Sequence, residues 1–195
     1  MKKLIFIIIL IVIGGCSDIS TLTYIKNPSY EGSIRDIPIW LDIRFSKIEG
    51  IKIEEGIREW NTSLNGAIVM EIVDDRFNME DWKIKEMLSQ DGFMILKINH
   101  KNPIVNDDEG MHTLAFVNRI GGNLMYLIYD RLSEDMIKYI VLHEVGHLLG
   151  LGHDGNYLMS RSYNKERFEC VDDETMKRVA EIWKLDLGRL NYCRR

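Results

Sequence analysis

The chain has 195 residues, enough for one domain of ordinary size. Its composition, 46% hydrophobic and 28% charged, is that of a globular protein, and three prolines without a low-complexity tract argue against a disordered or repeat protein. The net charge of -5, with no basic run, argues against a protein that binds nucleic acid through the phosphates.

The N-terminal segment has the layout of an export signal. Two lysines precede an unbroken apolar run over residues 4–13, and a helix of that length rises about 15 Å, roughly half of a membrane core. The run ends in Ile13-Gly14-Gly15-Cys16, which resembles the lipobox of bacterial lipoproteins, where the cysteine is lipidated. The alternative is an ordinary cleaved signal with an incidental cysteine. We expect residues 1–15 to be a signal peptide and Cys16 to anchor the exported protein in the cell envelope, at an outer membrane or on the outer face of the cytoplasmic membrane.

A polar, punctuated segment follows and predicts a tether over residues 16–35. Apolar residues then alternate over residues 37–45, which predicts a strand. Over residues 53–64 they recur every three or four positions, which predicts a helix that ends at Asn65-Gly66. Further strands are expected over residues 67–73, 93–98, 113–117 and 124–129, a weakly patterned helix over 81–88, and an acidic loop over 106–110. This order predicts a mixed sheet with helices packed on it.

The C-terminal third contains the strongest helix signals. Ser133 is expected to be the N-cap of a helix with acidic residues in its first turn, where the helix dipole favours them. This helix should run to about Leu149 and stop at Gly150. A last helix is expected from about Asp172 to Lys184.

The segment His143-Glu144-Val145-Gly146-His147 lies within the first of these helices. Residues four apart share one face of a helix, so the two histidines can bind a single zinc ion. Glu144 can reach a water on that metal without being a ligand itself, which is the position of a general base. The alternative is an ordinary helix with unrelated core and surface histidines.

The motif continues through Gly150 to His153 and completes the pattern H-E-x-x-H-x-x-G-x-x-H. Glycine can adopt a positive φ, so Gly150 allows the sharp turn that brings His153 back to the metal as a third ligand. Three protein ligands leave a fourth position open for water, which is typical of a catalytic rather than a structural zinc site.

The segment from His143 to His153 resembles the zinc signature of the metzincin metallopeptidases. The family also has a methionine in a tight turn beneath the metal, and the resemblance implies that Met159 is this Met-turn residue, ordinary core packing being the alternative. It implies an α+β, metzincin-like (zincin) domain over residues 36–195. Such a domain would have a twisted mixed sheet with a backing helix, an active-site helix, a Met-turn and a C-terminal helix.

Within the metzincins the resemblance leans towards the matrixin-like catalytic domains, because Leu114-Ala115 after the acidic loop is similar to their upper-rim edge strand. Asp154, after the third histidine, is instead similar to the adamalysin residue. The cysteines that archaemetzincins have around the Met-turn are absent, and Arg161 stands where astacin-like enzymes have a tyrosine ligand. The structural-zinc histidine of matrixins would fall near Phe116, so a second zinc is not expected, and no cysteine-bearing propeptide is recognisable.

The resemblance implies hydrolysis of peptide bonds by a zinc-activated water, with Glu144 as general base. A polypeptide substrate would lie extended along the edge strand, beside Leu114 and Ala115, and a monomer is expected. Arg161 and Tyr163 are expected to line a specificity pocket, unless they belong to a surface loop. One alternative function is a zinc amidase for a non-protein, cell-wall amide. The other is a surface binding or inhibitor protein on a metzincin fold, against which the intact Glu144 argues.

Three smaller features complete the predictions. The oxygens of residues 106–109 could hold calcium, although such acidic runs are more often solvated turns. Cys170 and Cys193 predict one disulfide in an exported protein, with two free thiols as the alternative. His100 and His112 are expected at the surface, because neither has ligand spacing to another histidine.

Overall fold

The computed structural model describes residues 23–25, 35–73, 92–107, 112–154, 157–165 and 168–194. The predicted signal peptide with Cys16, the predicted helix over residues 81–88 and residues 108–110 of the acidic loop lie outside this part of the chain. Within the described part, no helix is both long and apolar enough to cross a membrane.

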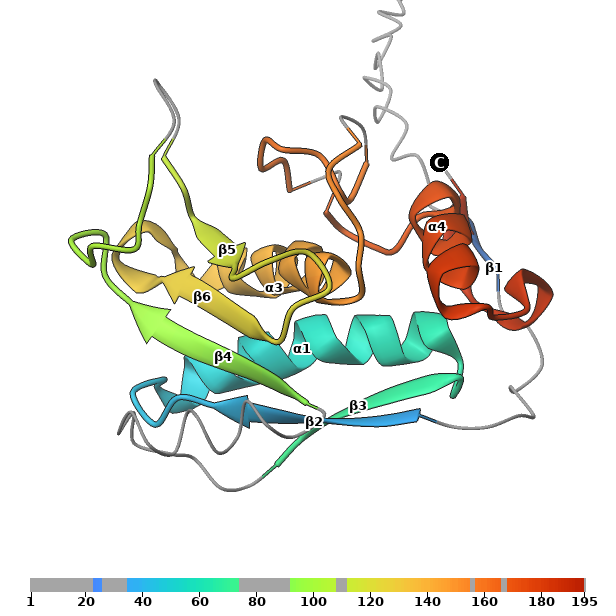
Figure 1. Ribbon diagram of the computed structural model, residues 1–195, viewed down its shortest axis with the longest axis horizontal. Helices are drawn as coiled ribbons and strands as arrows, with labels where there is room; N and C mark the ends of the chain where they lie inside the picture. The colour runs from blue at the N-terminus through green and yellow to red at the C-terminus, as the bar shows by residue number, and fades with distance from the viewer. Residues whose placement is uncertain are drawn as a thin grey trace, which may run out of the picture.

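The centre of the fold is a five-stranded sheet with the strand order β3-β2-β4-β6-β5 (Figure 1). Four strands run parallel: β2 (Arg35–Leu41), β3 (Ile68–Ile72), β4 (Phe93–Ile98) and β6 (Leu124–Ile128). The short strand β5 (Ala115–Val117) pairs with β6 in the opposite direction and forms one edge. The prediction of a mixed sheet is therefore confirmed.

Two helices, α1 (Lys47–Leu64) and α3 (Glu134–Leu148), pack side by side on one face of this sheet (Figure 1). Gly56 of α1 permits the close approach, because a Cβ there would lie 2.8 Å from the carbonyl oxygen of Lys138. The fully buried Trp60 joins the two helices, since its Nε1 donates a hydrogen bond of 2.7 Å to the carbonyl of Leu142. The predicted backing helix therefore supports the helix that contains the histidine motif.

Two boundaries differ from the predictions for physical reasons. Strand β2 ends at Leu41 rather than at residue 45, because the buried carboxylate of Asp42 accepts hydrogen bonds from the backbone N–H of Arg44 and of Lys97 and turns the chain. Helix α1 starts before the predicted apolar stripe. Its N-cap Ser46 and Glu49 form a capping box, which fixes the start of the helix.

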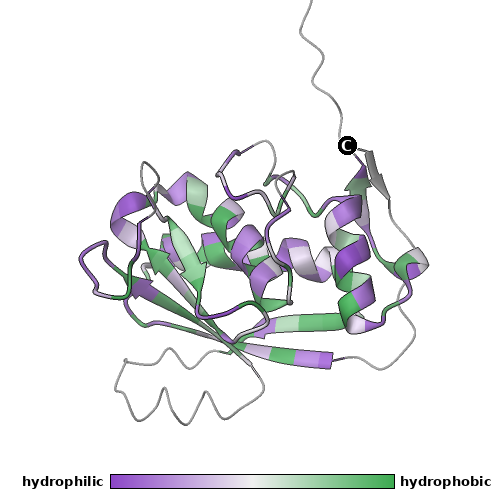
Figure 2. Ribbon diagram, turned by 45° about the horizontal axis from the view of Figure 1, so that its top comes forward, coloured by the Kyte–Doolittle hydropathy of each residue, from purple (hydrophilic) through white to green (hydrophobic). Residues whose placement is uncertain are grey.

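The other elements are close to their predicted bounds. Strand β4 coincides with the predicted range, β6 ends one position earlier, at the short 3-10 helix Tyr129–Arg131, and α3 starts after Ser133, whose side chain makes no capping hydrogen bond. Helix α4 (Asp173–Trp183) has Asp172 as its N-cap, and a further 3-10 turn, Leu187–Arg189, follows it. Figure 2 shows hydrophobic and hydrophilic residues alternating around α4, whose buried side includes Met176 and Val179.

A second, two-stranded antiparallel sheet lies beside α4 (Figure 1). It pairs β1 (Thr23–Ile25) with β7 (Tyr192–Arg194), and neither strand was expected. Three residues of the predicted tether are therefore paired with the C-terminal end of the chain. Cys193 of β7 forms a disulfide with Cys170, with a Cα–Cα distance of 6.4 Å.

Candidate metal centre

Helix α3 places three polar side chains in a buried position. His143 is 5% exposed, Glu144 5% and His147 6%, within a helix whose neighbouring residues are apolar and buried. Burying polar groups in such surroundings is unfavourable unless each one finds a partner. Burying these three polar side chains in α3 therefore has a cost in solvation free energy, which is typical of a functional site.

Backbone carbonyls fix the orientation of the two helical imidazoles. The Nδ1–H of His143 donates to the carbonyl of Leu158 at 2.6 Å, and the Nδ1–H of His147 donates to the carbonyl of Leu151 at 2.6 Å. A carbonyl only accepts, so both protons lie on Nδ1, and both Nε2 atoms keep a lone pair for a metal.

The chain reverses just after the helix and returns with the third histidine. Gly150 has a φ of 101°, in the left-handed region, and the N–H of Leu151 closes the turn on the carbonyl of Gly146 at 2.9 Å. The Nε2 atoms of His147 and His153 then lie 3.2 Å apart. One nitrogen of each of the three histidines lies within 4.8 Å of the others.

These ring nitrogens and Glu144 fit a zinc ion with its water. Burial, and next the neighbouring His147, lower the pKa of His143 to about 3, and the pKa of His147 is also lowered by burial. Burial, His147 and Arg161 lower the pKa of His153 to about 4. The histidines are thus neutral, as metal binding requires. Within the described residues, Oε2 of Glu144 is buried without a hydrogen-bond partner, and burial raises the pKa of this carboxyl to about 8.

The predicted Met-turn residue lies beneath these ligands. Met159 is fully buried, and a Cβ on Gly146 would lie 2.5 Å from its Sδ. Gly146 is the third residue after His143 and precedes His147, so the thioether packs against α3 between the two helical ligands. The turn begins at Tyr157, which has a φ of 57°.

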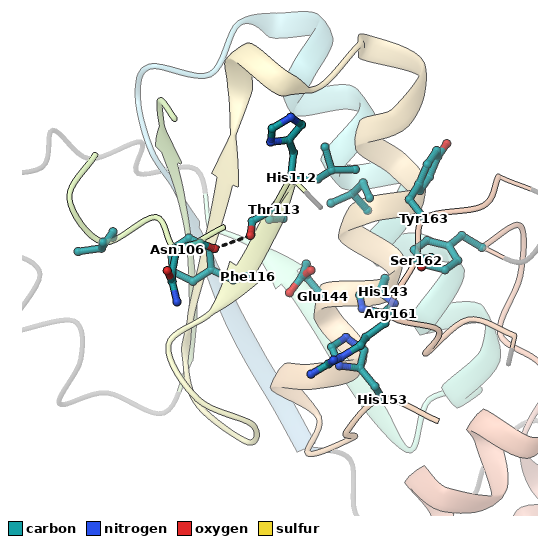
Figure 3. Close-up of a pocket in the computed structure, with 15 residues that line it drawn as sticks. Asn106, His112, Thr113, Phe116, His143, Glu144, His153, Arg161, Ser162 and Tyr163 are labelled. Atoms are coloured by element: carbon teal, nitrogen blue, oxygen red, sulfur yellow. Dashed lines mark hydrogen bonds between the residues drawn. The ribbon is translucent and has the colours of Figure 1, made fainter. Parts of the chain in front are cut away.

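A cleft of about 550 Å³ opens over the site (Figure 3). Figure 3 shows His143, Glu144, His153 and Arg161 grouped at its floor, with Phe116 on the β5 side and Tyr163 on the opposite side. All four residues that were expected to contact substrate line the cleft: Leu114, Ala115, Arg161 and Tyr163.

Sequence reasoning missed several residues of this cleft. Phe168 is buried and its ring stacks on His143, with ring centroids 4.8 Å apart, but no spacing in the sequence connects the two. Ile140 lies one turn before His143, so helical periodicity could have identified it. His112 lies at the surface as expected and also lines the cleft, whereas His100 pairs with Asp130 away from it.

Comparisons with known proteins bear on the fold. No family model matches the sequence, and no curated protein matches it. Among solved structures, archaemetzincin from Methanopyrus kandleri has 14% identity and a TM-score of 0.50, over 80% of this chain and 98% of that one. High choriolytic enzyme 1, a hatching enzyme zinc-protease from the medaka fish Oryzias latipes, has 13% identity and a TM-score of 0.46, over 83% and 95%.

The fold is metzincin-like. The prediction of an α+β domain with a backing helix, an active-site helix and a C-terminal helix is confirmed, and the histidine triad fits one zinc ion. The likeness to the archaemetzincin structure concerns the fold alone, so the matrixin-like placement stays a prediction. At this identity the likeness to archaemetzincin concerns the fold, and the cysteines expected of that subgroup around the Met-turn are still absent from the sequence.

In the part of the chain that the structure describes, the triad is the only cluster of three or more candidate metal ligands. Of the acidic loop proposed for calcium, Asp107 is described, and both of its carboxylate oxygens accept hydrogen bonds from Arg131. These bonds hold the pKa of Asp107 well below its usual range. The other acidic members of the loop, Asp108 and Glu109, lie outside the described residues.

Proposed function

We propose that this chain is a zinc-dependent endopeptidase of the metzincin type. One observation supports the proposal above all others. Three neutral imidazoles converge on one point, and the buried Oε2 of Glu144, which has no hydrogen-bond partner among the described residues, lies at the floor of the same cleft. A structural zinc site would be closed by four protein ligands, and here the fourth side opens to the cleft.

The proposed mechanism assigns different tasks to the metal and the chain. Zinc, when bound, would polarise the scissile carbonyl and lower the pKa of a water towards 7. His143, His147 and His153 would hold the ion, the first two through the Nε2 atoms that their Nδ1 bonds to backbone carbonyls leave free. Glu144 accepts the proton of the attacking water and delivers it to the leaving amine. Met159 supports the ligand helix from below and does not touch the metal.

The substrate is proposed to bind as an extended polypeptide along β5. Within the described chain this strand pairs on one side, with β6, so its other side can add a strand. Ala115 and the preceding Leu114 line the cleft, so the cleft runs along this edge strand. A cleft beside an edge strand favours an extended peptide as substrate over a small amide, which would bind in a closed pocket. A zinc amidase is the second candidate function. The intact Glu144 argues against the third, a binding protein without activity.

A side pocket beyond the metal is proposed to recognise one substrate side chain. Tyr163 packs edge-on against Phe168, with ring centroids 5.5 Å apart, and Ile140 adds an apolar wall. Arg161 is exposed and lies beside His153 at the floor of the cleft, and among the described residues it makes no ion pair.

Location and subgroup are proposals that rest on sequence. We propose that residues 1–15 are removed as a signal peptide and that Cys16 is lipidated, so that a monomeric domain over residues 36–195 is tethered to the cell envelope. Labelled fatty acid should enter the wild-type protein and not a Cys16→Ala variant. The matrixin-like placement rests on Leu114-Ala115.

The proposed activity is tested by cleavage of a mixed peptide library with the full chain in detergent. We expect cleavage by the wild-type protein, loss of cleavage after chelation, and recovery with zinc. Glu144→Gln should lower kcat by about 10²–10⁴-fold while retaining about one zinc per chain, because it removes the base and leaves the ligands in place. A zinc-loaded wild-type protein that cleaves no peptide would contradict the peptidase and favour the amidase.

A further inference from the structure

The three histidines of the site are not held equally. His143 and His147 are buried, and each has its Nδ1 bonded to a backbone carbonyl. His153 is exposed, and in the described part of the chain no hydrogen bond is made by its Nδ1. Its place at the metal therefore depends on the conformation of the backbone on either side of it.

A side chain from another element holds that backbone. Arg178 of α4 donates from one guanidinium nitrogen to the carbonyl of Gly152 at 2.9 Å and from the other to the carboxylate of Asp154 at 2.9 Å. The two acceptors directly precede and follow His153 in the chain. In addition, the N–H of Asp154 donates to the carbonyl of Met159 at 3.1 Å, which connects the same loop to the Met-turn.

The helix behind Arg178 is firmly anchored. Asp172 caps its start, and near its end the Nε1 of Trp183 donates to the carbonyl of Leu149 at 2.8 Å. Met176 and Val179, on either side of Arg178, are fully buried. The side chains of Arg178 and Asp154 are only 29% and 20% exposed, so this pair is better sheltered from solvent than an ordinary surface ion pair.

We infer that Arg178 is a positioning residue, which keeps His153 at the metal by bridging the residues on both sides of it. The inference rests on the proposed zinc site and adds a residue that does not touch metal or substrate. The planar guanidinium suits the task because its nitrogens donate in two fixed directions at once, which an ammonium does not do. Without the bridge, the third ligand leaves the metal more often and zinc escapes faster.

The test measures zinc release from the full-length, zinc-loaded protein into an excess of a chelating dye. Partners that orient metal ligands typically contribute 10–100-fold to metal affinity, so Arg178→Gln should release zinc at least about tenfold faster. Arg178→Lys should be intermediate. Asp154→Asn should accelerate release less than Arg178→Gln, because the bond to Gly152 remains. Lys177→Gln is the matched control, since within the described residues Lys177 pairs only with Asp173 and Glu174 on its own helix.

A second readout separates positioning from general stability. The metal-free Arg178→Gln protein should unfold within a few degrees of the wild type, because the bridge acts on the position of His153 rather than on the folded core. Zinc release at the wild-type rate would overturn the inference, as would equal acceleration in Lys177→Gln or a large fall in the unfolding temperature of the metal-free variant. A wild-type protein that binds no zinc would instead refute the proposed function itself.

Discussion

His143, Glu144 and His147 lie on successive turns of α3, whereas His153 and Met159 lie on chain that has left the helix at Gly150. The helical half is held by the packing of α3 against α1 and by two short bonds from its imidazoles. The loop half is held by α4, through Arg178 and Asp172. One half of the site is therefore encoded by the local spacing of its residues, and the other half by contacts between segments that are distant in the sequence.

The largest expected loss of stability follows from a substitution of Asp172, which holds the loop half of the site. This carboxylate is fully buried and accepts from the N–H of Leu158 at 3.2 Å, and from the N–H and hydroxyl of Thr175 at 2.9 and 2.8 Å. Asp172→Ala removes an N-cap and leaves the Leu158 amide unpaired, so the free energy of unfolding should fall by about 2–4 kcal/mol. Denaturant unfolding of the metal-free protein measures this change.

Asp173→Ala is the matched control for that measurement. Asp173 is the neighbouring residue in the first turn of α4, but it is partly exposed and, in the part of the chain that the structure describes, pairs only with Lys177. Its loss should change the free energy of unfolding by less than about 0.5 kcal/mol. Equal effects at the two positions would show that Asp172 serves α4 alone and that the Met-turn is held in some other way.

The helical half of the site could be predicted from the sequence, and the contacts that hold the loop half could not. The spacing of the histidines, the need for glycine at position 150 and the approximate bounds of α4 are local signals, and the structure agrees with them. Arg178 and Phe168 act on the site from a distance in the chain, and nothing in one sequence marks an arginine or phenylalanine for such a contact. Strand β1 could not be predicted either, because a strand of three residues forms only when its partner β7 is in place.

A smaller effect is expected where the two halves meet, at Gly146. An alanine there would place its Cβ 2.5 Å from the Sδ and 3.1 Å from the Cε of Met159, which has no room because it is fully buried. Overpacking of this kind typically costs about 1–3 kcal/mol, while alanine favours the helix by up to about 1 kcal/mol. Gly146→Ala should therefore lower the free energy of unfolding by about 1–2 kcal/mol.

A double variant tests whether the methionine is the cause. If the clash with the thioether dominates, Gly146→Ala should cost much less in a Met159→Ala background, and the two changes should be strongly non-additive. Additive effects would mean that Gly146 is required by the helix itself. The predicted contact between the Met-turn and α3 would then have no energetic role.

The smallest effect is expected at the substrate side of the site, where Arg161 follows the Met-turn and lines the cleft. Apart from Glu144, no carboxylate is among the described residues that line this cleft. A cation without a partner beside apolar walls favours a substrate with a negative charge close to the scissile bond. Matched peptides with Glu, Gln or Lys at one position should therefore differ in kcat/KM by about tenfold, with Glu the best, since one well-placed charge contributes on the order of 1.4 kcal/mol.

Charge reversal separates recognition from other roles of this arginine. Arg161→Glu should invert the order of the three peptides and leave zinc content unchanged, because the preference arises from the sign of one charge rather than from the metal ligands. Lys165→Glu is a suitable control, since Lys165 is exposed, lies over the ring of Tyr139 and does not line the cleft. If Arg161→Glu lowered kcat equally for all three peptides, the arginine would act at the reacting carbonyl, and the loop half would then supply a catalytic group as well as a ligand.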